Sequence, residues 1–68
     1  MPLIQITMGA GRTAEQKRDL LAAITQAAHE TTGTPLAAVR AWIVEIPAEQ
    51  LMIAGETLAE RQAAGSTH

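Results

Sequence analysis

The chain has 68 residues and no cysteine, and this combination limits the ways in which it can reach a stable fold. A domain of this size buries about 60% of the surface that its unfolded form exposes, so a core built from one copy is marginal. Disulfides and thiolate metal sites are excluded, and His29 and His68 are too few for a zinc centre. We therefore expect copies of the chain to associate, and we expect no metal or cofactor.

Composition excludes further classes of protein. The net charge is -2 and the basic residues form no run longer than Lys17-Arg18, which argues against a nucleic-acid partner. No segment approaches the roughly 20 apolar residues that a membrane span needs, and the amino terminus lacks the features of a signal peptide. We expect a cytoplasmic protein without a membrane partner, with an interior built from aliphatic residues because Trp42 is the only aromatic one.

The amino-terminal half predicts a strand followed by a long helix. Residues 3–8 alternate between two faces, which is the period of a strand. Thr13 followed by Gln16 forms a capping box that opens a helix, and Gly33 suits its left-handed end. One apolar stripe at helical spacing contains Leu20, Leu21, Ile24, Ala27 and Ala28.

A second strand over residues 39–46 follows a short helical turn that begins at Thr34-Pro35. Two strands joined by a long helix predict a parallel pair with a right-handed crossover, so the fold class is α/β (α+β) with a β-α-β protomer. Such a sheet leaves one face and both edges bare, which favours association of subunits.

The carboxy-terminal part predicts smaller elements within the same single domain, residues 1–68. A turn is expected at residues 47–50 and an irregular or hairpin segment at 51–55. Thr57 with Glu60 caps a short helix, and we expect residues 63–68 to form a frayed tail.

Pro2 is the residue with the most distinctive chemistry. Removal of Met1 would leave Pro2 at the amino terminus with a free secondary amine, whereas prolines elsewhere have no N–H and no basic nitrogen. Apolar surroundings and neighbouring arginines would lower the pKa of that amine toward neutrality, so that it could take and return protons. An accidental Met-Pro start is the alternative interpretation.

Two arginines and the tryptophan are the other candidates. Arg12 precedes the start of the expected helix, where a guanidinium, free N–H groups and the helix dipole all attract a carboxylate. Arg40 and Trp42 share one face of the second strand and are expected to point into a space between subunits. Taken singly, each arginine is more readily explained as a solvated charge or surface ion pair than as a ligand, and Trp42 as a core or interface residue.

Several short motifs together carry a family resemblance. They are Met1-Pro2-Leu3-Ile4, Gly11-Arg12-Thr13, Thr34-Pro35, Ala38-Val39-Arg40 and Ile53-Ala54-Gly55-Glu56. With these motifs the chain resembles the 4-oxalocrotonate tautomerase family over nearly its whole length. The resemblance implies a β-α-β protomer in an oligomeric, MIF-like assembly, usually a hexamer made as a trimer of dimers.

The same resemblance implies a cofactor-independent isomerase that ketonises an enol or dienol acid of the 2-hydroxymuconate or phenylenolpyruvate type. Pro2 would shuttle the proton, Arg12 would bind a substrate carboxylate, and Arg40 from a neighbouring subunit would stabilise the developing charge. Leu51 stands where the family usually has a phenylalanine that lines the pocket, and Trp42 stands where it usually has an aliphatic residue. We expect both to contact substrate, and we expect them to alter substrate preference.

Two alternatives remain open at this point. A lyase-type relative that hydrates or dehalogenates unsaturated acids would need a further carboxylate near Pro2 to activate water, and no acidic residue is clearly placed for that role. An oligomeric binding module without catalytic activity would not need the terminal amine, and retention of Met1 would favour it.

Overall fold

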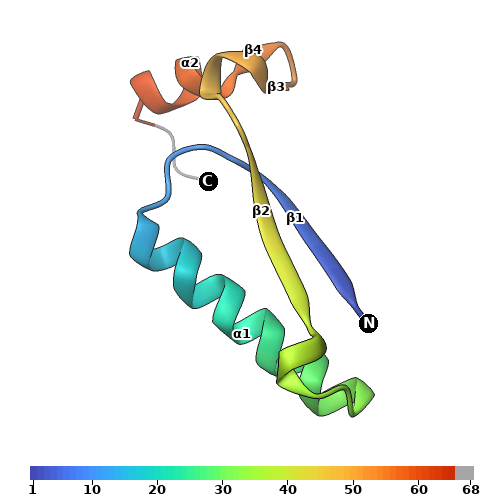
Figure 1. Cartoon of the computed structure of the whole chain (residues 1–68). Coiled ribbons are helices and arrows are strands. Elements are labelled where there is room, and N and C mark those ends of the chain that lie inside the picture. The colour runs from blue at the N-terminus through green and yellow to red at the C-terminus, as the bar shows by residue number, and fades with distance from the viewer. Residues whose placement is uncertain (66–68) are drawn as a thin grey trace.

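The computed structural model describes residues 1–65 and contains a β-α-β unit followed by a small carboxy-terminal unit. Strand β1 (Leu3–Gly9) leads into helix α1 (Ala14–Thr32), and strand β2 (Arg40–Ile46) returns parallel to β1 (Figure 1). The register runs from Leu3 opposite Arg40 to Gly9 opposite Ile46. The predicted parallel pair joined by a long helix is therefore confirmed, and β1 and β2 each keep one edge without a partner strand in the described chain.

Local signals at both ends of α1 act as the sequence predicts. The Thr13 hydroxyl accepts a hydrogen bond from the Gln16 N–H at 3.1 Å, and the Gln16 side chain accepts from the Thr13 N–H at 3.0 Å. At the other end Gly33 adopts a left-handed conformation, with φ of 74°. His29 Nδ1 lies 2.6 Å from the Thr34 carbonyl oxygen, which fastens the end of α1 to the following turn.

The carboxy-terminal unit starts with a turn of 3-10 helix, η2 (Ala48–Gln50), where a turn was predicted. A hairpin of β3 (Met52–Ile53) and β4 (Glu56–Thr57) turns through Ala54 and Gly55, which have φ of 52° and 86°. Helix α2 (Leu58–Ala63) follows, with the expected capping box. Both a hairpin and a helix are thus present.

Three details differ from the sequence prediction. The short turn before β2 is the 3-10 helix η1 (Leu36–Ala38), one residue later than expected, and Val39 caps it instead of starting the strand. Ala27 is exposed although it was placed in the apolar stripe. Ala63 is the last residue of α2 and so is part of a helix, while residues 66–68 of the predicted frayed tail lie outside the described residues.

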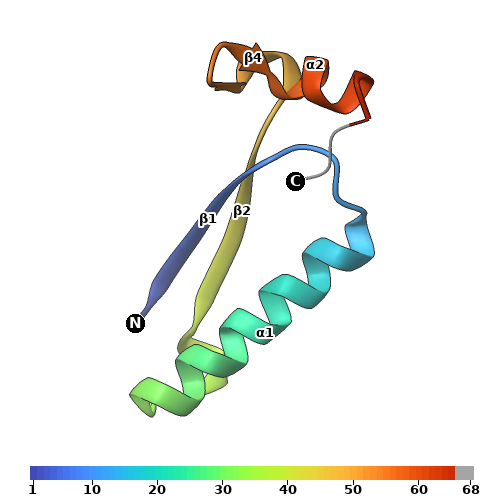
Figure 2. The same ribbon diagram turned by 180° about the vertical axis from the view of Figure 1, so that it is seen from behind.

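The core of the described chain is small. Within residues 1–65 only Val39 and Leu58 are buried, at 8% and 6% exposure. Helix α1 packs against β2, and both views show it running along one side of the strand pair (Figures 1 and 2). The face away from α1 is exposed throughout and carries Leu3, Gln5, Thr7, Arg40, Trp42 and Val44. A single copy therefore has a small core and an uncovered sheet face, which favours association with a partner surface.

Neither helix that the structure describes has the length and apolar character needed to cross a membrane.

Candidate active site

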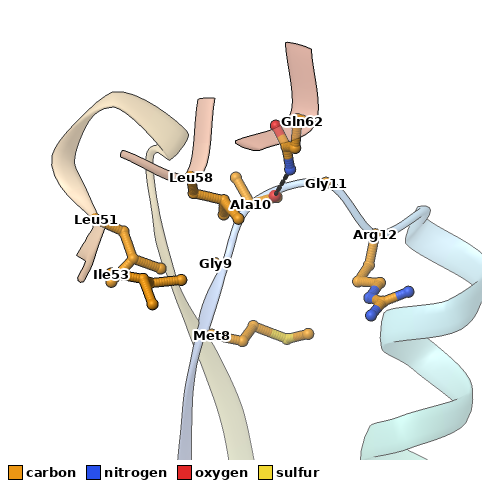
Figure 3. Close-up of a pocket in the computed structure, with 9 residues that line it drawn as sticks. All are labelled: Met8, Gly9, Ala10, Gly11, Arg12, Leu51, Ile53, Leu58 and Gln62. Atoms are coloured by element: carbon orange, nitrogen blue, oxygen red, sulfur yellow. Dashed lines mark hydrogen bonds between the residues drawn. The ribbon is translucent and has the colours of Figure 1, made fainter. Parts of the chain in front are cut away.

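A pocket of about 340 Å³ lies where β1 ends and α1 begins, beneath the carboxy-terminal unit (Figure 3). Most of its wall is apolar, and its polar side chains are those of Arg12 and Gln62. The lining residues are Met8, Gly9, Ala10, Gly11, Arg12, Leu51, Ile53, Leu58 and Gln62. Its volume is within the range of about 300–1,000 Å³ typical of small-molecule sites. Arg12 and Leu51, predicted to contact substrate, therefore line one cavity.

Gly9 sets how closely the carboxy-terminal unit approaches β1. A Cβ built on Gly9 would lie 2.6 Å from Cδ2 of Leu58 and 3.3 Å from Cδ2 of Leu51. The backbone of Gly9 has an ordinary strand conformation, so the glycine is needed for space and not for its torsion angles. Leu58, the most buried side chain, packs on the bare backbone at this point and forms the floor of the pocket.

Arg12 brings an unneutralised charge to this pocket. The ion pairs within residues 1–65 join Lys17 to Glu45 at 2.7 Å and Arg61 to Glu56 at 3.7 Å, and neither involves Arg12. The Gln62 amide nitrogen lies 3.5 Å from the Ala10 carbonyl oxygen, a weak contact between α2 and the loop that leads to Arg12 (Figure 3). An exposed guanidinium beside apolar walls suits a ligand that has a carboxylate on an apolar skeleton.

Pro2 and Arg40 lie at the opposite end of β1, and Trp42 lies on β2 opposite Gln5. The Arg40 N–H donates to the Pro2 carbonyl oxygen at 3.1 Å, which holds Pro2 in the sheet. The Arg40 guanidinium donates to the Ala37 carbonyl oxygen at 2.6 Å, and no carboxylate in the described chain pairs with it. Trp42 lies on the exposed face and donates to Oε1 of Gln5 at 3.2 Å.

One copy of the chain does not assemble the predicted site. Six residue steps separate Leu3 from Gly9, which at about 3.3 Å per residue is about 20 Å of strand. Pro2 and Arg40 lie at one end of the strand, and Arg12 and Leu51 lie near the other end. The structure thus brings the predicted residues together in two groups, which one copy of the chain does not unite.

Comparison with known proteins identifies the family. The model of the family described as "Tautomerase enzyme" matches residues 2–61. The chain belongs to the tautomerase family. A 2-hydroxymuconate tautomerase of Pseudomonas putida is 47% identical to this tautomerase over 60 residues, which cover 88% of this chain and 95% of the relative.

Solved structures agree with this assignment. TomN, described as a 4-oxalocrotonate tautomerase homologue in the tomaymycin biosynthetic pathway, superposes with a TM-score of 0.82 at 45% identity, covering 96% of this chain and all of the other. A heterohexameric 4-oxalocrotonate tautomerase from Chloroflexus aurantiacus superposes with a TM-score of 0.79 at 42% identity, covering 88% and 97%. The predicted fold and the resemblance are confirmed, and the protein is an isomerase. The relatives named here are tautomerases, so they support neither a lyase nor a binding module without activity.

Seven of the nine pocket residues were not predicted as site residues. Met8, Gly9, Ala10 and Gly11 belong to the end of β1 and the loop after it, and Ile53, Leu58 and Gln62 reach the cavity because the carboxy-terminal unit folds back over the end of β1. The one available signal was Gly9, a glycine directly after an alternating strand, which often marks the close approach of another segment.

Proposed function

We propose that this tautomerase ketonises an enol or dienol acid of the 2-hydroxymuconate or phenylenolpyruvate type, with Pro2 as the proton carrier after removal of Met1. The observation that carries the proposal is that the family match begins at residue 2. Met1 is 76% exposed, so an aminopeptidase has access to it. Chain processing would turn the Pro2 nitrogen from an amide into a basic secondary amine.

The reaction needs one base and two sites of positive charge. The Pro2 nitrogen takes the proton of the 2-hydroxyl group, and the protonated amine then returns a proton to carbon 3 of the enol acid. The C2–C3 double bond becomes single and the C2–O bond becomes a carbonyl. Arg12 binds the carboxylate, and Arg40 stabilises the negative charge that develops on the oxygen at carbon 2. Two guanidiniums close to the Pro2 amine would disfavour its protonated form and so favour the neutral base.

The free edge of β1 suggests how two copies could share a site. Strand β1 is centred on Ile6, so an antiparallel pair that used the whole strand would put Leu3 of one copy opposite Gly9 of the other. The same register would put Pro2 beside Ala10 of the partner, next to the pocket that Arg12 and Leu51 line. Arg40 would come from a neighbouring subunit, and Trp42 and the rest of the exposed sheet face would lie between subunits. A hexamer made as a trimer of dimers satisfies these requirements.

Intact mass and rate measurements test the proposal. Purified protein should lack the mass of Met1 and should ketonise 2-hydroxymuconate or phenylenolpyruvate, followed by ultraviolet absorbance. Pro2→Ala should lose about 10²–10⁴-fold in kcat, the usual contribution of a positioned base. Pro47→Ala is the matched control, because its nitrogen is an ordinary amide far along the chain from Pro2, and it should keep its activity. Equal rates for Pro2→Ala and wild type would remove Pro2 from the mechanism.

Mixed oligomers test whether the site is shared. Pro2→Ala and Arg12→Ala chains, each inactive alone, should regain part of the activity when they are unfolded together and refolded as a mixture. A hybrid dimer has one intact pair, Pro2 from one chain and Arg12 from the other. Mixtures that stay as inactive as their parents would place Pro2 and Arg12 in the same chain's site.

A further inference from the structure

The ion pair between Lys17 and Glu45 lies beside Arg12 and bears on how that arginine meets its ligand. We infer that Lys17 is a positioning residue for substrate binding: it holds Glu45 away from Arg12 and so leaves the Arg12 guanidinium free for the substrate carboxylate. The inference rests on the proposed function, in which Arg12 binds that carboxylate. Lys17, Glu45 and Arg12 belong to the same copy of the chain, so the effect needs no residue of a neighbouring subunit.

The register of the sheet brings Glu45 to the wall of the Arg12 pocket. Glu45 lies opposite Met8 in the pairing of β2 with β1. Met8 lines the pocket together with Arg12, and Figure 3 shows its side chain extended toward Arg12. Glu45 also lines an open hollow with Ala10 and Gly11, the two residues that lead to Arg12. A free carboxylate at this position would compete with substrate, because carboxylates pair strongly with guanidinium groups.

Lys17 reaches Glu45 from helix α1. Its Nζ lies 2.7 Å from Glu45 Oε1, and the two side chains are 27% and 36% exposed, so water screens this pair only in part. Lys17 also lines, with Met8 and Arg12, a second hollow of about 210 Å³. Arg12 is therefore the cation that remains on this surface for Glu45 if the charge of Lys17 is lost.

The position of Lys17 in the helix supports a role beyond that of a solvated charge. It is the fourth residue of α1, close to the helix end where the dipole favours acidic residues and disfavours a lysine. The pair with Glu45 offsets this cost and leaves Arg12 as the free cation at the helix start. Glu15, which is also close to Arg12 in the sequence, is exposed and lines neither hollow.

Variants that remove one charge test the inference through KM for phenylenolpyruvate. In Lys17→Met the freed Glu45 should raise KM by about three- to fivefold, the upper part of the range for an exposed charge interaction, with little change in kcat. Glu45→Gln removes the same ion pair but leaves no carboxylate to compete, so its KM should stay at the wild-type value or fall. The double variant should return KM close to the wild-type value.

Arg18→Met is the matched control. It takes the same charge from the neighbouring position of α1, which is exposed and lines neither hollow, so KM should not change. The inhibition constant of cinnamate, a monocarboxylate that the enzyme does not turn over, should follow the same order as KM across all four variants. It reports binding without a contribution from the chemical step.

A purely mechanical role for the ion pair gives a different pattern. If Lys17 and Glu45 only held α1 against β2, both single variants would raise KM and the double variant would stay impaired, and this result would overturn the inference. An unchanged KM in Lys17→Met would also overturn it. If Lys17→Met fails to fold, Glu45→Gln decides, because a raised KM there contradicts competition by Glu45 and an unchanged or lower KM supports it. Failure of the wild-type enzyme to ketonise either acid would instead refute the proposed function.

Discussion

The contact between Gly9 and Leu58 predicts a specific coupling between strand β1 and helix α2. Leu58→Ala removes a side chain that is only 6% exposed. It should lower the free energy of unfolding by about 2–3 kcal/mol, the lower part of the range for buried leucines, because water can enter the adjoining pocket. Gly9→Ala places a Cβ 2.6 Å from Leu58 Cδ2 and forces that side chain to move. Overpacking should lower the free energy of unfolding by about 1–3 kcal/mol, and replacing a strand glycine by alanine should raise it by about 0.5–1 kcal/mol. The net loss of stability for Gly9→Ala should be about 1 kcal/mol.

The double variant with Gly9→Ala and Leu58→Ala tests whether the two substitutions act through the same contact. With Ala at position 58, the Cβ at position 9 enters space that Leu58 has vacated, so it should cost little or even stabilise the fold. The two changes together should therefore be less damaging than their sum by about 1 kcal/mol or more. Urea unfolding at one fixed protomer concentration measures this, since the stability of an oligomer depends on concentration.

Gly33→Ala combined with Leu58→Ala is the control cycle. Gly33 has φ of 74° and no atom within 4 Å of a built Cβ. Gly33→Ala should therefore lower the free energy of unfolding by about 1–2 kcal/mol through backbone strain alone. That cycle should be additive within about 0.3–0.5 kcal/mol. Equal additivity in the Gly9 cycle would refute the claim that the glycine is there to admit Leu58.

Two further predictions concern the long helix and the assembly. Thr13→Ala removes the capping hydroxyl of α1 and should lower the free energy of unfolding in urea by about 1 kcal/mol. Thr31→Ala loses only a hydrogen bond to the Ala27 carbonyl near the helix end, so its free energy of unfolding should stay within about 0.5 kcal/mol of wild type. Similar losses for both variants would contradict the capping argument. Trp42 is 40% exposed in the single chain, so dilution of the oligomer into monomers should shift its fluorescence emission to longer wavelength as activity is lost. If the emission maximum stays constant while the oligomer dissociates, Trp42 does not lie in the subunit interface.

The elements that the sequence predicts well are those fixed by neighbours along the chain. The Thr13–Gln16 and Thr57–Glu60 boxes each satisfy free N–H groups within three residues, and Gly33 ends α1 through its own torsion angles. Alternation alone placed Arg40 and Trp42 on the face of β2 away from α1. Such features depend on short-range geometry and need no knowledge of the tertiary fold.

The pocket could not be predicted in the same way because it joins residues about fifty positions apart. Gly9 has a recognisable role only beside Leu58, and Gln62 only beside Ala10. The family resemblance named Arg12 and Leu51, but it did not show that they share a cavity at the end of β1 opposite to Pro2. That separation follows from the seven-residue length of the strand.

The same strand length links the stability of the protein to its chemistry. A short chain with two buried residues in its described part leaves the edge of β1 and a whole sheet face open. In the proposed assembly, a second, antiparallel copy would cover that edge and supply buried surface, and the register that pairs Leu3 with Gly9 would also carry Pro2 to the Arg12 pocket. One association would therefore complete the fold and the site together. It follows that a substitution which weakens the β1 edge should lower stability and activity in parallel, whereas a substitution in the pocket wall should change substrate preference while the oligomer persists.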